Sequence, residues 1–321
     1  MKILITGGAG YIGSHTAKAL SRAGFEPVAL DNLSIGHEWA VRWGPLVRCD
    51  LSERARVSEA ISAHKIEAVI HFAAYAYVGE SVQDPRKYFR NNVTNTLNLL
   101  DAMLDTGVRR VIFSSTCATY GDPVAMPIAE DHVQRPVNPY GESKLFVEKV
   151  LRWYQSAYGL QWAALRYFNV AGADVDGEIG EDHDPETHLV PLAIQTALGL
   201  HPELTVFGTD YATPDGTAIR DYVHVADVAD AHVRALVYLL DGGQSIALNL
   251  GSGNGSSVRE IVAAVERISG RAVRIREAAR RAGDPDRLLA DASRVAASMG
   301  WRPQLSTPDR IVETALRWHR R

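Results

Sequence analysis

Tyr140 and Lys144 stand four positions apart, after the turn residues Asn138 and Pro139 and ahead of apolar residues at helical spacing. That spacing predicts a helix that runs to about Tyr158 and carries both side chains on one face. A phenol with a pKa of about 10 is a poor base at neutral pH, but a neighbouring ammonium group lowers that pKa. The pair therefore indicates proton transfer by tyrosine, although an ordinary surface pair has the same spacing.

A second pattern lies at the N-terminus, where an apolar strand at 2–6 precedes a glycine-rich turn and a helical pattern to about residue 23. The turn carries the glycines of a dinucleotide fingerprint in two overlapping spacings, Gly8, Gly10 and Gly13 or Gly7, Gly10 and Gly13. A strand at 27–30 then ends in Asp31, whose carboxylate can accept hydrogen bonds from an adenosine ribose. Because no arginine follows at once, NAD is favoured over NADP. The competing interpretation is a structural glycine turn.

The following units repeat the alternation of strand and helix. Strands are expected at 46–49, 68–72 and 110–113, and helices at 53–63 and about 84–106. This order predicts an α/β fold, a Rossmann-type doubly wound parallel sheet whose strand ends face one crevice.

Polar and small residues at those strand ends are candidate cofactor contacts. Asp50 is placed to meet an adenine ring, and Ala73 and Ala74 leave room for close backbone approach, unless they only pack against a helix. Asn91 serves either the cofactor or neighbouring backbone. The hydroxyl-rich end of the fifth strand places Thr116 to contact a substrate hydroxyl, or merely to satisfy a turn.

The alternation loosens after residue 169, where a polar loop at 172–186 leads into a smaller C-terminal α/β substrate domain. We expect domains at 1–170 and 171–321, with about 222–250 returning to the first. The loop region contains Glu181, His183, Asp184, Glu186 and His188, but their spacing fits no standard metal site. The sequence therefore predicts a loop and no metal.

Composition bounds the function classes. The 321 residues are 46% hydrophobic and 22% charged with a formal net charge of -4, which suits a soluble globular protein and gives no pull toward nucleic acid or membrane. No apolar run reaches the length of a membrane span, so we expect a cytoplasmic protein. Only Cys49 and Cys117 are present, which excludes a disulfide framework, and both are expected to be reduced and buried.

Several segments together carry a family resemblance. They are Thr6-Gly7-Gly8-Ala9-Gly10-Tyr11-Ile12-Gly13, Asp31-Asn32, His71-Phe72-Ala73-Ala74, Ser114-Ser115-Thr116, Tyr140 with Lys144, Arg166-Tyr167-Phe168-Asn169, Gly208-Thr209-Asp210-Tyr211, Asp215-Gly216-Thr217, Arg220-Asp221-Tyr222-Val223-His224 and Arg280-Arg281-Ala282-Gly283-Asp284. Over essentially the whole chain, these segments resemble the extended short-chain dehydrogenase/reductase family and, within it, the UDP-glucose 4-epimerases. The resemblance implies an isomerase of galactose metabolism that interconverts UDP-glucose and UDP-galactose through a 4-keto sugar, with tightly bound NAD.

The resemblance also implies residue roles. Tyr140 would take the proton of the sugar's 4-hydroxyl, Lys144 would lower the phenol pKa and bind the nicotinamide ribose, and Thr116 would bond the 4-oxygen. The implied cofactor contacts are Gly7, Gly10, Tyr11, Ile12, Gly13, Asp31, Asn32, Asp50, Leu51, Phe72, Ala73, Ala74, Asn91, Tyr140, Lys144 and Phe168. The implied contacts of the UDP-sugar are Thr116, Asn169, His188, Leu189, Val206, Phe207, Arg220, Tyr222, Arg281, Asp284 and Leu288.

Other functions stay open at this point. Nucleotide-sugar dehydratases of the family carry an Asp-Glu pair where this chain has Cys117-Ala118, and an NAD-sensing relative is expected to lose the tyrosine or the lysine. Leu288 aligns with a position that limits room around the sugar's C2 substituent, so UDP-N-acetylhexosamines are alternative substrates. Related enzymes of this overall appearance also interconvert UDP-xylose and UDP-arabinose, so these pentoses are a further alternative. As a hypothesis, the helices at about 84–106 and 141–158 pair with their copies in a homodimer.

Overall fold

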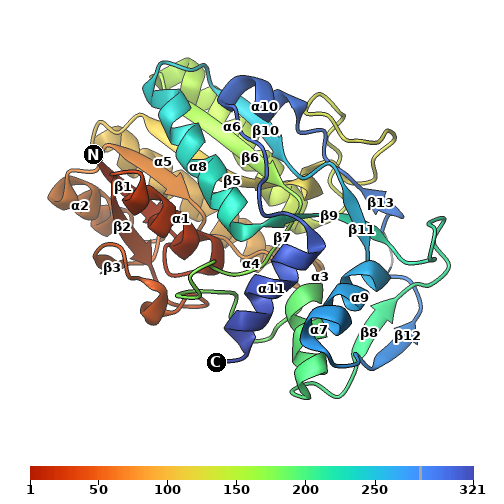
Figure 1. The fold of residues 1–321 in the computed structure, drawn as a ribbon. Helices are drawn as coiled ribbons and strands as arrows, with labels where there is room; N and C mark the ends of the chain where they lie inside the picture. The colour runs from red at the N-terminus through yellow and green to blue at the C-terminus, as the bar shows by residue number, and fades with distance from the viewer. Residues whose placement is uncertain (282–283) are drawn as a thin grey trace. The chain divides into compact units, whose positions relative to one another are not determined.

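A seven-stranded sheet organises the first part of the chain in the computed structural model, which describes residues 1–281 and 284–321 (Figure 1). The strands lie in the order β10-β6-β5-β4-β1-β2-β3. Their bounds are β1 (Lys2–Thr6), β2 (Glu26–Asp31), β3 (Leu46–Arg48), β4 (Ala68–His71), β5 (Arg110–Thr116), β6 (Gln161–Tyr167) and β10 (Ile246–Leu250). Pairings among β1 to β5 are parallel, and the order reverses between β1 and β4. The predicted Rossmann-type doubly wound sheet is confirmed.

Helices cover both faces of this sheet because successive strand residues point to opposite sides and both sets are apolar. The helical segments of this part are α1 (Tyr11–Arg22), η1 (Glu38–Ala40), α2 (Arg54–His64), α3 (Val78–Gln83), α4 (Pro85–Tyr88), η2 (Phe89–Thr94), α5 (Asn95–Asp105), η3 (Cys117–Thr119), α6 (Pro139–Tyr158) and α8 (Val225–Leu240). Leu4, Val69 and Val111 join one core with α2, α5 and α6. Ile70 and Ile112 are fully buried outside that cluster, and α1 and α8 cross the sheet's front in Figure 1.

The prediction of a single helix at about 84–106 is wrong. Asp84 caps the short α4 by accepting from the Lys87 amide at 3.1 Å, and the wider π-helical turn η2 separates α4 from α5. Within η2, the buried Asn92 side chain accepts from the Tyr75 backbone N–H at 2.9 Å and donates to the Tyr75 carbonyl at 2.9 Å. It also donates to Ser143 Oγ at 3.1 Å. Apolar periodicity cannot reveal such a turn, because a π-turn shifts the helix by a single residue.

Helix α6 forms where its sequence predicts it. The Asn138 side chain accepts from the Gly141 amide at 2.8 Å, Pro139 occupies the first turn, and Gly159 ends the helix with a φ of 71°. Asparagine, proline and glycine suit these positions because of side-chain capping, a fixed φ and freedom in the left-handed region. Tyr140 and Lys144 are thereby held in the first turns of a 20-residue helix.

The remaining chain packs mainly around three helices. Its elements are β7 (Asn169–Ala171), α7 (Leu189–Leu198), β8 (Leu204–Phe207), β9 (Ile219–His224), β11 (Gly255–Ser257), α9 (Val258–Ser269), β12 (Ile275–Ala278), β13 (Arg287–Leu288), α10 (Ser293–Met299) and α11 (Pro308–His319). Strand β9 pairs with β7, β11 and β13, while β8 pairs with β12. Helices α7, α9 and α11 share one apolar core, and Ser257 with Glu260 forms a capping box at the start of α9.

Contacts divide the chain into two compact units. The first comprises Met1–Asp122, Asp131–Arg166 and Ala229–Leu248, and the second comprises Pro123–Glu130, Tyr167–Val228 and Asn249–Arg321. The sequence predicts limits at 1–170 and 171–321 with a return at about 222–250. That prediction, which assigns a ligand to each part, stays a prediction. The compact units themselves change at Arg166, and Pro123–Glu130 belongs to the second unit. Among the described residues, no helix combines the length and apolarity needed to cross a membrane.

Candidate active site

The turn between β1 and α1 is too crowded for side chains. A Cβ atom on Gly13 would lie 2.1 Å from the Gly7 carbonyl oxygen, and one on Gly7, whose φ is +71°, would lie 2.7 Å from the Ala73 nitrogen. Gly10 caps α1, so Tyr11 and Ile12 begin the helix. Backbone amides at a helix N-terminus suit an anion such as a pyrophosphate. The turn therefore fits the dinucleotide that its sequence predicts.

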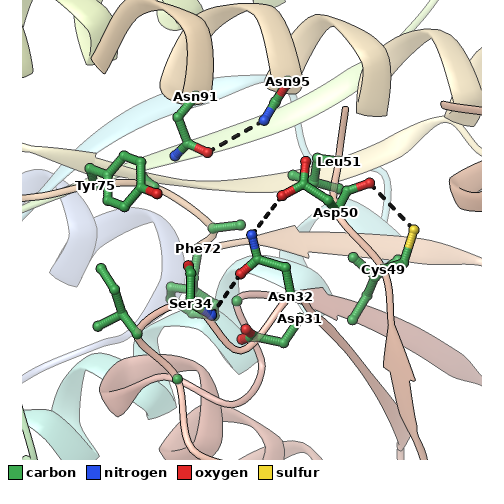
Figure 2. Close-up of a pocket in the computed structure, with 16 residues that line it drawn as sticks. Asp31, Asn32, Ser34, Cys49, Asp50, Leu51, Phe72, Tyr75, Asn91 and Asn95 are labelled. Carbon is green, nitrogen blue, oxygen red and sulfur yellow. Dashed lines mark hydrogen bonds between the residues drawn. The ribbon is translucent and has the colours of Figure 1, made fainter. Parts of the chain in front are cut away.

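A pocket opens beside this turn at the ends of the parallel strands (Figure 2). Its lining residues are Gly7, Leu30, Asp31, Asn32, Ser34, Ile35, Gly36, Cys49, Asp50, Leu51, Phe72, Ala73, Ala74, Tyr75, Asn91 and Asn95. The pocket brings together most of the predicted cofactor contacts. Phe168, another of them, lies buried in the second unit just before β7.

Two carboxylates shape the pocket in different ways. Asp31 accepts the Ala9 amide at 3.0 Å and the Leu33 amide at 2.8 Å, and burial raises its pKa in spite of these bonds. Asp50 accepts from the Asn32 side chain at 2.6 Å, as Figure 2 shows. Burial raises the pKa of Asp50, but hydrogen bonds from Ser52 and Asn32 outweigh it and lower the pKa overall. Asp31 thus holds the glycine turn through the Ala9 amide. Asp50 holds the Asn32 side chain at the pocket lining.

The two adjacent asparagines of η2 have different roles. Asn91 lines the pocket and accepts from the Asn95 side chain at 3.4 Å (Figure 2). Asn92 bridges Tyr75 and Ser143 instead. The sequence left these two uses open for the pair. In the structure Asn91 takes the pocket position and Asn92 the bridge.

Thr116, Tyr140 and Lys144 lie buried together where β5 ends and α6 begins. Their exposed fractions are 6%, 9% and 3%. Lys144 Nζ donates to the Ser114 carbonyl at 2.8 Å and lies 6.0 Å from the centre of the Tyr140 ring. Thr116 also accepts from the Ala118 amide at 3.1 Å, which orients its hydroxyl.

Burial dominates the pKa values of this group. It raises the pKa of Tyr140 to about 12, against the lowering effect of a hydrogen bond with Thr116. It lowers the pKa of Lys144 to about 7. Thr116, not Lys144, is therefore the neighbour that favours the phenolate in this state. His71, bonded to Thr6 and Thr96, is held neutral because burial and the Lys144 charge lower its pKa to about 3.

A buried ion pair supports the same strand and helix. Glu148, one turn beyond Lys144 on α6, accepts from Arg166 Nη2 at 2.6 Å and from Ser115 Oγ at 2.6 Å. Both members of the ion pair are almost fully buried. Glu148 thereby ties α6 to β5 through Ser115 and to β6 through Arg166, and removing one partner of the ion pair would leave a buried charge uncompensated. The sequence shows Arg166 only as part of a motif and gives no sign of Glu148.

Residues predicted to hold a UDP-sugar gather on the strands of the second unit. Asn169 of β7 pairs with Tyr222 of β9, and Leu288 of β13 pairs with Arg220. Arg220 Nη2 lies 3.2 Å from Asp284 Oδ1.

Three further predicted sugar contacts, Val206, Phe207 and Arg281, lie on β8 or against its end. Val206 and Phe207 end that strand, and the Arg281 guanidinium lies 4.1 Å from the Phe207 ring centre. Ala282 and Gly283 of the quoted motif lie outside the described residues.

His188 and Leu189 stand at the start of α7, where His188 is the N-cap residue. The His188 imidazole is directed at carboxylates of its own loop, with Nδ1 2.8 Å from Glu181 Oε1. His183 and Glu186 join the same cluster, whereas Asp184 does not. The sequence predicts only a loop here, because side chains that meet through loop folding leave no regular spacing.

Comparison with known proteins places this arrangement in a family. The model of the NAD dependent epimerase/dehydratase family matches residues 3–251. The chain belongs to this family. The UDP-glucose 4-epimerase of Rhizobium meliloti (strain 1021) is 51% identical over 319 residues, which cover 99% of this chain and 97% of that protein.

Two solved structures are similar to the whole chain. The UDP-glucose 4-epimerase from Brucella ovis in complex with NAD has a TM-score of 0.97 at 54% identity and covers 98% of this chain and 97% of its own. The UDP-glucose-4-epimerase from Stenotrophomonas maltophila with bound NAD and formylated UDP-arabinopyranose has a TM-score of 0.96 at 41% identity and covers 100% and 98%. Family membership confirms the resemblance and the dependence on NAD.

Sequence reasoning missed some of the residues that line this family's pocket here. They are Leu30, Ser34, Ile35, Gly36, Cys49, Tyr75 and Asn95. Asn95 had a detectable signal, because it stands one helical turn after Asn91. Gly36 had none, since its role depends on the Ala9 backbone, 2.9 Å from where its Cβ would lie.

Proposed function

We propose that this protein is a UDP-glucose 4-epimerase, which interconverts UDP-glucose and UDP-galactose through a 4-keto sugar with tightly bound NAD. The observation that carries the proposal is the buried group of Thr116, Tyr140 and Lys144 beside a dinucleotide-binding turn. The similarity to UDP-glucose 4-epimerases over nearly the whole chain supports it.

The glycine turn, Asp31, Asp50, Asn91 and the lining of the pocket would hold the NAD. When bound, NAD supplies the hydride acceptor and donor that oxidation and reduction at C4 require. The glycine turn has no room for a Cβ at Gly7 or Gly13, because the backbone there packs too closely, and this tight turn supports the assignment of its amides to the pyrophosphate. Lys144 would bind the nicotinamide ribose.

The protein's own residues handle the proton. Oxidation of the C4 alcohol leaves a proton on its oxygen, which Tyr140 accepts as phenolate. Thr116 donates a hydrogen bond to the same oxygen. Tyr140 returns the proton after the 4-keto sugar has presented its other face, so the reaction is balanced without a second redox substrate.

Inversion requires a firm grip on UDP and a loose grip on the hexose. We assign uracil to the end of β8 at Val206 and Phe207, the diphosphate to Arg220 and Arg281, and the ribose to Asp284. Arginine's planar fork suits paired phosphate oxygens. Asn169, His188, Leu189, Tyr222 and Leu288 complete the proposed substrate contacts.

The substrate range depends on the residues around the sugar ring. Leu288 lies in β13 and pairs with Arg220. A leucine at this position leaves open whether the site accepts an N-acetyl group at C2. The similar Stenotrophomonas maltophila enzyme holds formylated UDP-arabinopyranose, which supports the pentose alternative. Dehydration is disfavoured because Cys117 and Ala118 offer no acid/base pair.

The test is incubation of purified protein with UDP-galactose alone, followed by chromatography of the nucleotide sugars. UDP-glucose is the expected product. A 4-keto-6-deoxy sugar would identify a dehydratase, and no product would leave an NAD-sensing protein as the better interpretation. Parallel reactions with UDP-arabinose and UDP-N-acetylgalactosamine rank the three substrate classes.

We further propose that the enzyme works in the cytoplasm in galactose metabolism, as a homodimer, with residues 1–170 serving NAD and 171–321 serving the nucleotide sugar. A soluble composition supports the first part.

A further inference from the structure

Four side chains ahead of α7 point their ligand atoms at one spot. Glu181, His183, Glu186 and His188 each offer one carboxylate oxygen or imidazole nitrogen, and all four atoms lie within 4.8 Å of one another. Both glutamates are buried, and His183 is largely buried, whereas the His188 side chain is 45% exposed. This cluster plays no part in the proposed proton transfer, although His188 is also among the proposed contacts of the UDP-sugar.

Four of the distances among these side chains are close to those of a tetrahedral metal site. Glu181 Oε1 lies 2.8 Å from His188 Nδ1 and 3.3 Å from His183 Nδ1. Glu186 lies 3.1 Å from His188 Nδ1 through Oε1 and 3.6 Å from His183 Nδ1 through Oε2. Four ligands at about 2.0–2.2 Å from a zinc ion would stand roughly 3.3–3.6 Å apart, so only small adjustments separate the two geometries.

Hydrogen bonding accounts for only part of the cluster, since His188 Nδ1 bonds Glu186 Oε1 at 3.1 Å while Glu181 Oε1 is left, among the described residues, without a bond of normal geometry. An imidazole Nδ1 carries at most one hydrogen, yet each Nδ1 here faces both carboxylates. Within the described part of the chain, Glu181 Oε1 is buried and makes no hydrogen bond of normal geometry, although it is aimed into the cluster. A buried carboxylate needs a charged partner, and a central cation would satisfy all four groups at once.

Surrounding bonds hold the ligands in place, as metal sites require. Trp318 Nε1 donates to the Glu181 carbonyl at 3.0 Å. Glu186 Oε1 accepts from the backbone amides of Thr187 at 2.7 Å and His188 at 2.8 Å. The loop is thus held in part by the Trp318 indole and by backbone amides.

We propose that Glu181, His183, Glu186 and His188 bind one divalent transition-metal ion, zinc being the best fit. Two imidazoles and two carboxylates suit zinc, whereas calcium and magnesium prefer oxygen ligands alone. The ion would tie the loop to the first turn of α7. This site goes beyond the proposed function and needs no sugar for its test.

The experiment titrates Zn²⁺ into the metal-free full chain against a chromophoric chelator, with bound metal counted by mass spectrometry. Glu181→Gln and His183→Ala remove one ligand each, and His201→Ala changes an exposed histidine outside the cluster. We expect one zinc per chain for the wild type and His201→Ala. Binding should weaken by at least about 100-fold in the two ligand variants, since loss of an outer partner alone costs about 10–100-fold.

Equal zinc affinity in the wild type and the ligand variants would overturn the proposal, as would no stoichiometric zinc in the wild type. If circular dichroism shows that both ligand variants fail to fold, the visible absorption spectrum of Co²⁺ bound to the wild type tests the site instead. Intense visible absorption of tetrahedral Co²⁺ supports the site, and the weak spectrum of octahedral Co²⁺ contradicts it.

Discussion

Burial acts in opposite directions on Tyr140 and Lys144. It raises the pKa of the phenol to about 12 and lowers that of the amine to about 7. Without cofactor, the site therefore holds a neutral phenol next to an amine that is only partly charged at neutral pH. The base form of Tyr140 then depends on its bond with Thr116 and on positive charge that arrives with the ligands.

Replacing Tyr140 with phenylalanine tests the proton-transfer role. Tyr140→Phe should lower turnover of UDP-galactose by about 10²–10⁴-fold, because the only proton acceptor proposed at the 4-hydroxyl is lost. UDP-sugar affinity by calorimetry should stay near the wild-type value. Tyr158→Phe, at the exposed end of the same helix, is the control. Near-normal turnover in Tyr140→Phe would refute the mechanism.

The buried Lys144 predicts a pH-dependent stability. Its pKa is about 7 in the folded protein and 10.5 when unperturbed, so between these values the unfolded chain holds a proton that the folded chain has lost. Stability of the wild type relative to Lys144→Met should therefore rise from pH 7 to pH 10, by at most about 1.4 kcal/mol per pH unit. Urea unfolding of the cofactor-free proteins measures this, and parallel stability curves would contradict it.

At the scale of elements, strands and capped helices could be predicted because their signals are local. The strands expected at 2–6 and 110–113 appear as Lys2–Thr6 and Arg110–Thr116. Helix α6 begins at Pro139, directly after the turn residue Asn138, as its sequence predicts. Contacts between distant segments could not be predicted. The η2 turn depends on Asn92 reaching Tyr75, and the cluster at Glu181 depends on the path of a loop.

The β1–α1 turn yields a prediction about cofactor retention. Gly13→Ala would place a Cβ 2.1 Å from the Gly7 carbonyl oxygen, so the backbone of the turn must move. We expect NAD affinity to fall by about tenfold or more, since the proposed amide contacts would be misplaced. Calorimetric titration of NAD measures this effect.

Gly79→Ala is the matched control for that experiment. Gly79 lies within α3, and a Cβ there meets nothing within 4 Å. Its NAD affinity should equal that of the wild type. If Gly13→Ala bound NAD equally well, the turn would not be the pyrophosphate site.

At the scale of the whole molecule, α6 presents more apolar surface than its own core uses. Val147 and Leu151 pack into the sheet core, while Phe146 and Trp153 on the same helix are 49% and 75% exposed. Phe146 and Trp153 are seven positions apart and so share one face of the helix. An exposed aromatic face of this kind indicates a protein contact, and a second copy of the chain supplies an identical face across a two-fold axis.

A dimer is therefore expected by light scattering at micromolar concentration. The double variant Phe146→Glu and Trp153→Glu should be monomeric with unchanged circular dichroism, because burying four carboxylates at a two-fold contact is costly. Val124→Glu is the control, since Val124 is 90% exposed and lies outside α6. A wild-type monomer would exclude the homodimer, whereas a dimer that survives the double variant would place the interface elsewhere. Because Tyr140 and Lys144 lie on α6 as well, turnover of the monomeric variant shows whether dimerisation is needed to hold the catalytic turn.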